Sequence, residues 1–440
     1  MENIDEILTA MLEAAGAPGL RSAYAKILAP NDNSKNQVYL GGGFGALNII
    51  PHGDITRENG AQGGAVRERA YAYIDLRWID GQGAHVAPNA KLILYPRYPE
   101  VRLSGFLLGC RPSPTDLMGV GVRTPGRVLI LGVSGDGRIF ACAVGHDHPV
   151  AAEVEAIDTP LIGVFTDLSG LIPGRNDPVT VIREAVRAIA DIGWMPSVKL
   201  DKNGNPQPYA AQNGGGYTLE ASLGVRPNGR AEPDYEGWEV KQYSVRDFTR
   251  FAAKTPVTLM TPEPDGGLYH DDLPRFMVEH GYPDQNGVPD RVNFGGIYKV
   301  GGEQHRLTGL RLDLEGFEHR TGRFDPNGKV RLVAANGEAR ATWAFQKMLE
   351  HWSRKHARAA YIPSLKQGRP PEYRFSDNAT LFIGTDFIRL LSAIHEGLVY
   401  LDPALKAKTV NGAFVGGIHR RCQFRIRHND LPKLYEREIV

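Results

Sequence analysis

The pair Glu239 and Lys241 constrains the fold of this chain more than any other sequence feature. The two residues lie near the end of the segment 214–242, which reads GGGYTLEASLGVRPNGRAEPDYEGWEVKQ. Residues two apart in a β-strand point to the same face of the sheet. A strand over Trp238–Tyr243 therefore places both side chains together, and Asp234 opens the extended segment that leads into it. The pattern predicts a strand that carries a carboxylate and a lysine on one face, with a further carboxylate close by.

Carboxylates grouped with a lysine are suited to the hydrolysis of a phosphodiester bond. Hard cations such as Mg²⁺ prefer oxygen ligands, neutralise charge on the phosphate and lower the pKa of bound water. Asp234 and Glu239 are the expected ligands, together with the backbone carbonyl of Val240, and Glu220 supplies a third carboxylate from a preceding helix. Lys241 is expected to hold or polarise the attacking water. Alone, an E-x-K pair is also typical of a solvated strand edge. The surrounding sequence therefore decides whether this pair is interpreted as catalytic.

That context resembles the PD-(D/E)XK nucleases. Pro233 stands directly before Asp234, thirteen residues separate Glu220 from Asp234, and four separate Asp234 from Glu239. The spacing is similar to that of the MvaI/BcnI restriction endonucleases and of the mismatch-repair nickase MutH. This resemblance implies a catalytic set of Glu220, Asp234, Glu239 and Lys241 and Mg²⁺-dependent cleavage of double-stranded DNA, with Mn²⁺ as a substitute. It also implies a catalytic unit that acts as a monomer.

Later segments extend the same resemblance to the end of the chain. They are Pro256–Pro264, a helical run over Trp343–Ala360, a strand near Ala379–Leu381, and the ending Gln423–Tyr435. The implied fold class is an α/β PD-(D/E)XK core, a mixed sheet flanked by helices, preceded by a mostly-β, barrel-like N-terminal domain.

The predicted domain division follows from one segment rich in Asn, Gly, Pro and Lys. Residues 196–213 have no hydrophobic periodicity and read as a linker. We expect a mostly-β domain over residues 1–195 and the endonuclease domain over residues 214–440. A chain of 440 residues is long enough for two or more such domains.

The N-terminal part shows mostly strand patterns between two helices. Helices are expected over Asn3–Ala15 and Pro178–Ile192, the second with apolar residues along one face. Short apolar runs separated by Gly, Pro and Asp clusters predict a barrel or sandwich between them. The expected strands are Gln37–Leu40, Tyr71–Trp78, Lys91–Tyr95, Val128–Val133 and Arg138–Val144.

Two motifs in this part resemble the DNA-binding pseudobarrel of EcoRII-type effector domains and plant B3 domains. They are Lys26–Leu40 and Arg97–Phe106, although Asn36 stands where that family has histidine. The resemblance implies contacts with base edges in the major groove, which amide and guanidinium groups match. The alternative is that the arginines of the second motif only pair with Glu100. The candidate DNA-binding residues are Asn33, Lys35, Asn36, Arg97 and Arg102.

Positive charge collects near the end of a chain whose net charge is only +1. Residues 351–440 hold fifteen Lys and Arg against eight Asp and Glu, as expected of a DNA-binding face. Around an alternating strand pattern near the C-terminus, we expect phosphate contacts from His419, Arg420, Arg421, Arg425 and Arg427. For Arg354, Lys355 and Arg358, a solvated helix face is the alternative. Loops expected to read bases carry His305, Arg306, His319, Arg320 and Arg369.

Composition places the protein in the cytoplasm by default. No apolar run is long enough to span a membrane, so no membrane partner is expected, and Met1–Gly19 is acidic where a signal peptide is basic. Cys110, Cys142 and Cys422 lack the spacing of a zinc site or a disulfide framework and are expected as buried small hydrophobes.

We therefore expect a restriction or phage-defence endonuclease of double-stranded DNA with an additional DNA-recognition domain, with a cognate methyltransferase encoded nearby as a further expected partner. A MutH-like nickase or repair nuclease is the alternative within enzymes. A catalytically silent DNA-binding regulator is the alternative outside them, and the intact set of three carboxylates and a lysine argues against it.

Overall fold

The computed structural model describes the chain in two compact units. The described residues are 1–30, 35–58, 61–62, 65–66, 69–159, 161–211, 213–226, 233–353, 356–411 and 413–439. Unit 1 comprises Met1–Ala252, Ser353–Thr385 and Glu436–Val440, and unit 2 comprises Ala253–Trp352 and Asp386–Tyr435. Each unit is therefore built from segments that lie far apart in the sequence.

The N-terminal part of unit 1 is mostly β, as the sequence predicts. A helix, α1 (Ile4–Ala15), packs against a seven-stranded sheet, and its buried face carries Ile4, Ile7, Leu8 and Met11 at helical spacing. Asn3 caps this helix by accepting the Glu6 N–H at 2.8 Å. The sheet has the order β13 (Leu161–Ile162), β14 (Phe165–Asp167), β1 (Leu20–Leu28), β11 (Arg127–Ser134), β12 (Ile139–Val144), β7 (Leu76–Asp80), β8 (Gly83–Ala87).

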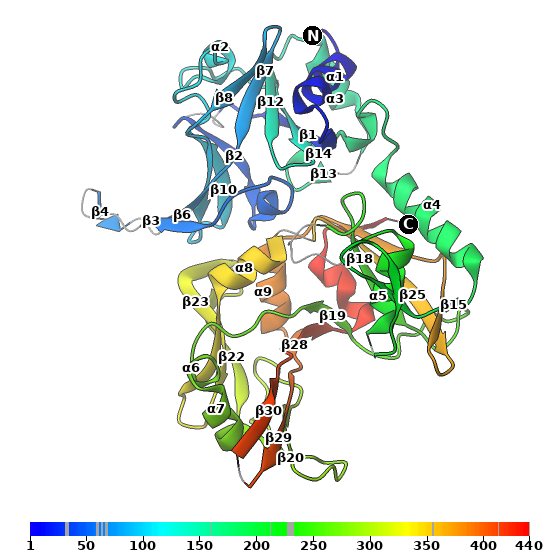
Figure 1. The fold of residues 1–440 in the computed structure, drawn as a ribbon. Helices are drawn as coiled ribbons and strands as arrows, with labels where there is room; N and C mark the ends of the chain where they lie inside the picture. The colour runs from blue at the N-terminus through cyan, green and yellow to red at the C-terminus, as the bar shows by residue number, and fades with distance from the viewer. Residues whose placement is uncertain are drawn as a thin grey trace. The chain divides into compact units, whose positions relative to one another are not determined.

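A second sheet and short helices complete this part (Figure 1). The five-stranded sheet has the order β2 (Gln37–Gly42), β10 (Glu100–Ser104), β9 (Lys91–Tyr95), β6 (Arg69–Tyr73), β3 (Thr56–Glu58), and β4 (Ala61–Gln62) pairs with β5 (Ala65–Val66). The remaining elements are η1 (Gly45–Asn48), α2 (Thr115–Met118), α3 (Pro149–Ala156), η2 (Ser169–Leu171) and α4 (Pro178–Ile192).

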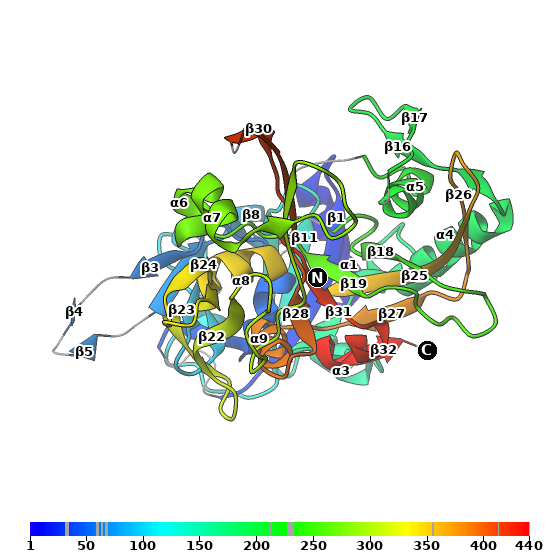
Figure 2. The ribbon, with the colours of Figure 1, turned by 90° about the horizontal axis from the view of Figure 1, so that it is seen from below.

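A mixed sheet forms the rest of unit 1. Its central strand, β25 (Arg358–Gln367), is parallel to β18 (Glu239–Ser244) and antiparallel to its other neighbours (Figure 2). The helix α5 (Gly214–Ser222) packs against β18. The other strands are β15 (Met195–Pro196), β26 (Glu372–Phe375), β27 (Thr380–Ile383) and β32 (Arg437–Ile439), with β16 (Val198–Leu200) and β17 (Pro206–Pro208) as a separate hairpin.

Unit 2 consists of three small sheets and short helices around an aromatic core. Trp343 is fully buried, packs edge to face on Phe424, and donates from its indole nitrogen to the Pro262 carbonyl at 2.9 Å. The sheets are β19 (Val257–Met260)–β31 (Phe424–Ile426)–β28 (Val399–Leu401), β20 (Tyr282–Pro283)–β21 (Arg291–Gly295)–β29 (Ala404–Val410)–β30 (Ala413–His419), and β22 (Arg311–Glu318)–β23 (Arg323–Val333)–β24 (Ala339–Ala344). The helices are α6 (Leu268–Asp271), α7 (Leu273–His280), α8 (Phe345–Ser353), α9 (Phe387–His395) and η3 (His428–Leu434).

Three sequence predictions need correction. The segment 196–213 is not an extended linker, because its residues pair in β15, in the β16–β17 hairpin and with the mixed sheet. The helical run predicted to Ala360 ends at Ser353, because the residues from Arg358 onward are buried as a sheet strand paired on both edges. The strand predicted over Tyr71–Trp78 is two strands in different sheets. The predicted domain limits themselves remain a prediction.

Other expectations are met. The strand predicted near Ala379–Leu381 is β27, and both predicted N-terminal helices are present. All three cysteines are buried and free. In the described part of the chain, no helix combines the length and the apolar character needed to cross a bilayer.

Candidate active site

A tight hairpin turn lies at the entry to β18. Tyr235 and Trp238 exchange two backbone hydrogen bonds, of 3.0 and 2.8 Å. The residues between them, Glu236 and Gly237, have φ angles of 46° and 85°. Positive φ at both central positions is the geometry of a two-residue type I′ hairpin loop, which suits glycine. The turn brings the chain before it alongside the start of β18.

Asp234 and Glu239 flank this turn and lie beside Lys241. The Asp234 carboxylate accepts a hydrogen bond from the Val240 N–H at 3.1 Å. The Lys241 ammonium donates to Glu239 Oε1 at 2.8 Å, and the two side chains are 16% and 6% exposed. The structure thus brings Asp234, Glu239 and Lys241 together at the start of β18. The predicted metal contact of the Val240 carbonyl stays a prediction.

Lys241 is held in its charged form. Burial alone lowers the pKa of its ammonium group, but the charge of Glu239, together with Tyr361, the hydrogen bond to Glu239 and the charge of Asp234, outweighs burial and raises that pKa above its usual range. A lysine in this state is a hydrogen-bond donor and a positive charge at neutral pH.

Glu220 lies on the helix α5, as predicted, and this helix begins at Gly214. Gly214 and Gly215 allow close packing, since a Cβ at Gly215 would lie 2.8 Å from the Gln242 side chain on β18. Among the residues that the structure describes, no three His, Cys, Asp or Glu side chains form a group that could hold a metal ion. The convergence of Glu220 with the other two carboxylates therefore stays a prediction.

The donor set fits a hard divalent cation. Asp234 and Glu239 offer carboxylate oxygens, and Mg²⁺ is commonly bound through one or two carboxylates with waters in its other positions. The partly buried ammonium of Lys241 keeps the cluster from being purely anionic. These residues would hold Mg²⁺ at the start of β18.

Comparison with known proteins identifies the class. A sequence model of the MvaI/BcnI restriction endonuclease family matches residues 183–435, more than half of the chain. The chain belongs to this family. Two solved structures of MvaI, one with cognate DNA and one without DNA, each cover 61% of this chain at 17% and 15% identity, with TM-scores of 0.45 and 0.33. The UbaLAI B3 domain with cognate DNA covers 38% of this chain at 19% identity, with a TM-score of 0.24. Among curated protein sequences, none matches this chain.

The N-terminal DNA-binding candidates have different surroundings. Asn33 lies outside the described residues, whereas Lys35 and Asn36 are exposed directly before β2. Arg102 forms an ion pair of 2.8 Å with Glu100 and lies over the Tyr95 ring. Arg102 therefore makes the ion pair with Glu100 that the sequence analysis gave as the alternative to a DNA contact. Arg97 is exposed in the turn between β9 and β10.

The predicted base-reading loops are only partly open to solvent. The His305 ring packs on Tyr298, and burial followed by the charge of Arg306 lowers its pKa. His319 is exposed, stacks on His395 at 4.6 Å and contacts Glu396 at 3.0 Å. Exposed arginines remain beside them and in the turn after β25: Arg306, Arg320 and Arg369.

The three C-terminal arginines divide into two kinds. Arg421 and Arg427 are exposed. Arg425 donates to Asp402 at 2.6 Å and to the Pro256 carbonyl at 2.7 Å. These bonds join β31 to neighbouring segments, so they argue against the phosphate contact predicted for Arg425. The sequence analysis also considered Arg354, Lys355 and Arg358 as one basic helix face. Arg358 is buried in the strand β25, and Arg354 and Lys355 lie outside the described residues.

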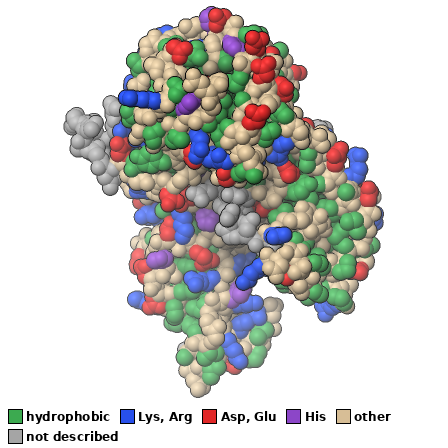
Figure 3. Space-filling model, turned by 45° about the horizontal axis from the view of Figure 1, so that its top comes forward, with side chains coloured by type: hydrophobic (Ala, Val, Ile, Leu, Met, Phe, Trp, Pro, Cys, Tyr) green, Lys and Arg blue, Asp and Glu red, His purple; other side chains and the backbone are tan. Residues whose placement is uncertain are grey.

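A basic β-ribbon in unit 2 was missed from the sequence. Lys406 on β29 is directly opposite Asn293 on β21 and His419 on β30, and the next row on that face holds Lys408 and Arg291. Figure 3 shows Lys and Arg side chains gathered at the lower end of the molecule, where this ribbon lies. Alternation of buried Leu405 and Ala407 with exposed lysines was the signal in the sequence.

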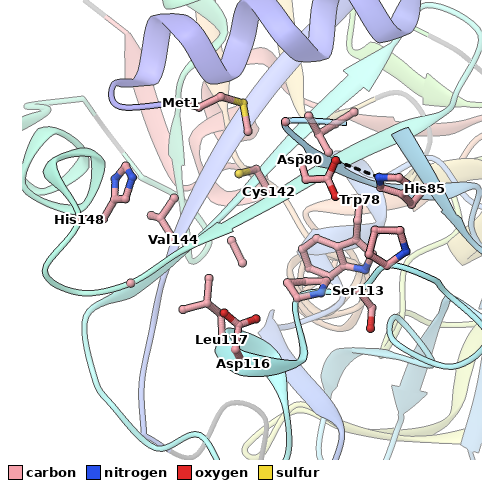
Figure 4. A pocket seen from close by; sticks show the side chains of 16 residues that line it. Met1, Trp78, Asp80, His85, Ser113, Asp116, Leu117, Cys142, Val144 and His148 are labelled. Atoms are coloured by element: carbon pink, nitrogen blue, oxygen red, sulfur yellow. Dashed lines mark hydrogen bonds and ion pairs between the residues drawn. The ribbon is translucent and has the colours of Figure 1, made fainter. Parts of the chain in front are cut away.

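A separate cavity of about 410 Å³ opens in the N-terminal β part (Figure 4). Its lining carries an Asp80–His85 pair of 2.9 Å, Asp116, His148 and the wall of Trp78. The lining residues include carboxylates and no Lys or Arg in the described part of the chain.

Proposed function

We propose that this chain is a Mg²⁺-dependent endonuclease that hydrolyses phosphodiester bonds in double-stranded DNA. The observation that carries the proposal is the 2.8 Å contact of the Lys241 ammonium with Glu239, beside an Asp234 carboxylate anchored to the same strand. The catalytic set is Glu220, Asp234, Glu239 and Lys241. Family membership supports the reaction class, and the carboxylate oxygens support the metal.

The residues have distinct roles in this proposal. Bound Mg²⁺ supplies charge neutralisation at the phosphate and lowers the pKa of water. Asp234 and Glu239 hold the cation. The Lys241 ammonium donates a hydrogen bond to the attacking water or to a phosphate oxygen and stabilises the negative charge that grows there. Glu220 orients water from α5.

The biological setting belongs to the same proposal. We infer a restriction or phage-defence role in the cytoplasm, a monomeric catalytic unit and a cognate DNA methyltransferase. DNA contacts would come from the basic ribbon with Lys406 and Lys408, from Arg421 and Arg427, and from the N-terminal domain.

Removal of the metal provides a direct test. Incubation of the protein with supercoiled and linear plasmid in excess EDTA should give no cutting, and added Mg²⁺ or Mn²⁺ should restore it. Conversion to linear DNA would indicate a double-strand cutter, whereas accumulation of nicked circles would indicate a nickase. Cutting at full rate in EDTA would refute the metal-dependent mechanism.

Two arginines four residues apart offer a matched test of DNA contact. If Arg421 binds a phosphate, Arg421→Ala should weaken binding on all sequences and reduce the salt slope by about 0.9. Arg425→Ala should leave that slope unchanged and instead lower the free energy of unfolding, because its partners are Asp402 and Pro256. Binding would be measured by fluorescence anisotropy in Ca²⁺ across a salt series. Equal slopes for Arg421→Ala and wild type would remove Arg421 from the DNA interface.

A further inference from the structure

Two residues of the turn before β18, Glu236 and Trp238, are held by the N-terminal half of the chain. Glu236 forms an ion pair with Arg175, whose other nitrogen donates to the Leu20 carbonyl at 2.7 Å. The Trp238 indole nitrogen donates to the carbonyl of Pro178, the first residue of α4, at 2.9 Å. Two residues of the turn are thus bonded to segments that precede it by more than fifty positions in the sequence.

A buried arginine lies next to Gly237 of the turn. A Cβ at this position would lie 3.2 Å from the Arg358 guanidinium. Arg358 is buried at the start of β25, where it pairs with Asp167 and donates to Ser169 Oγ at 3.3 Å. Asp167 is itself held by the Ser169 N–H at 2.9 Å. The Asp167–Arg358 ion pair therefore joins the N-terminal sheet to β25 at a point directly beside Gly237 of the turn.

The anchoring residues lie outside the part of the chain that matches the endonuclease family. The match begins at residue 183, whereas the anchors are Asp167, Ser169, Arg175 and Pro178. The support of the turn is therefore a feature of this chain's N-terminal half.

We propose that the N-terminal domain positions the catalytic turn, with Arg175 acting through Glu236 and Asp167 acting through Arg358. These are positioning residues, since they act on Asp234 and Glu239 through the backbone of the turn. A displacement of about 1 Å in a reacting group can slow a reaction about 10²-fold. The expected effect on the rate of DNA cleavage rests on the proposed nuclease function.

The exposed pair allows a test without unfolding the protein. Arg175 and Glu236 are 30% and 44% exposed, and a control pair in the N-terminal sheet, Arg77 and Asp75, is 30% and 48% exposed. Isolated pairs of this exposure contribute little to stability. The full-length variants are Arg175→Ala, Glu236→Gln, the double variant, the exchange Arg175→Glu with Glu236→Arg, and the control Arg77→Ala.

Two readouts are measured on each variant. Single-turnover cleavage should slow about three- to tenfold in Arg175→Ala and in Glu236→Gln, equally in the double variant, and recover partly in the charge exchange. DNA affinity in Ca²⁺ should stay within about twofold of wild type. Hydrogen–deuterium exchange at the amides of Tyr235 and Trp238 should become faster in the same variants and not in Arg77→Ala.

The outcomes separate this inference from the proposed function. Cleavage and exchange equal to those of Arg77→Ala would overturn the positioning role, as would faster exchange with unchanged cleavage. If the wild type cuts no DNA, the proposed function fails, and the exchange comparison then decides alone whether the N-terminal half holds the turn.

Discussion

Lys241→Ala is expected to slow DNA cleavage by at least about 10²-fold while leaving DNA binding within about twofold of wild type. The reason is that its partly buried ammonium stabilises charge that develops in the transition state, and loss of one such donor typically costs about 10²–10³ in rate. Single-turnover cleavage in Mg²⁺ and binding in Ca²⁺ would measure the two effects separately.

Lys366→Ala is the matched control, because Lys366 is an exposed lysine on the neighbouring strand β25. This variant should cut at the wild-type rate. Cleavage by Lys241→Ala at a rate equal to that of Lys366→Ala would remove Lys241 from the catalytic set.

Asp167→Ala is expected to lower the free energy of unfolding by about 3–5 kcal/mol. This substitution leaves the Arg358 guanidinium, which is 5% exposed, without its carboxylate partner, and a buried charge deprived of its partner is strongly destabilising. The charge of Asp167 is among the causes that hold the pKa of Arg358 above its usual range despite the opposing effect of burial. Arg358 therefore stays charged at all pH values where the protein is folded.

Urea unfolding followed by tryptophan fluorescence would measure this loss. Asp75→Ala, which breaks the exposed pair with Arg77, serves as the control and should cost less than about 1 kcal/mol. A loss for Asp167→Ala no larger than that of the control would show that the buried pair does not join the N-terminal sheet to β25.

The strand that carries Glu239 and Lys241 could be predicted because residues close together in the sequence determine it. Alternation places Glu239 and Lys241 on one face, and Gly237 suits the positive φ that the turn requires. The helix α4 was also evident, since Asp177 caps it and Pro178 occupies its first position. Such features depend on residues within a few positions of one another.

Contacts between distant residues could not be predicted in the same way. Arg358 and Asp167 are separated by 191 positions, and an arginine in a basic stretch gives no sign that it is buried. For the same reason Arg425 was assigned to DNA although Asp402 and Pro256 engage it. The helical pattern before β25 was misread because pairing with β18 and β27 determines the structure there.

The most direct test of the central claim is end sequencing of DNA cut by the full-length protein. Wild type and Glu239→Ala, prepared alike, would be incubated with Mg²⁺ and plasmid libraries of unmodified and methylated DNA. We predict ends that cluster at one recognition sequence for the wild type and none for Glu239→Ala. Equal cutting by both proteins, or no cutting of any library by the wild type, would contradict the account.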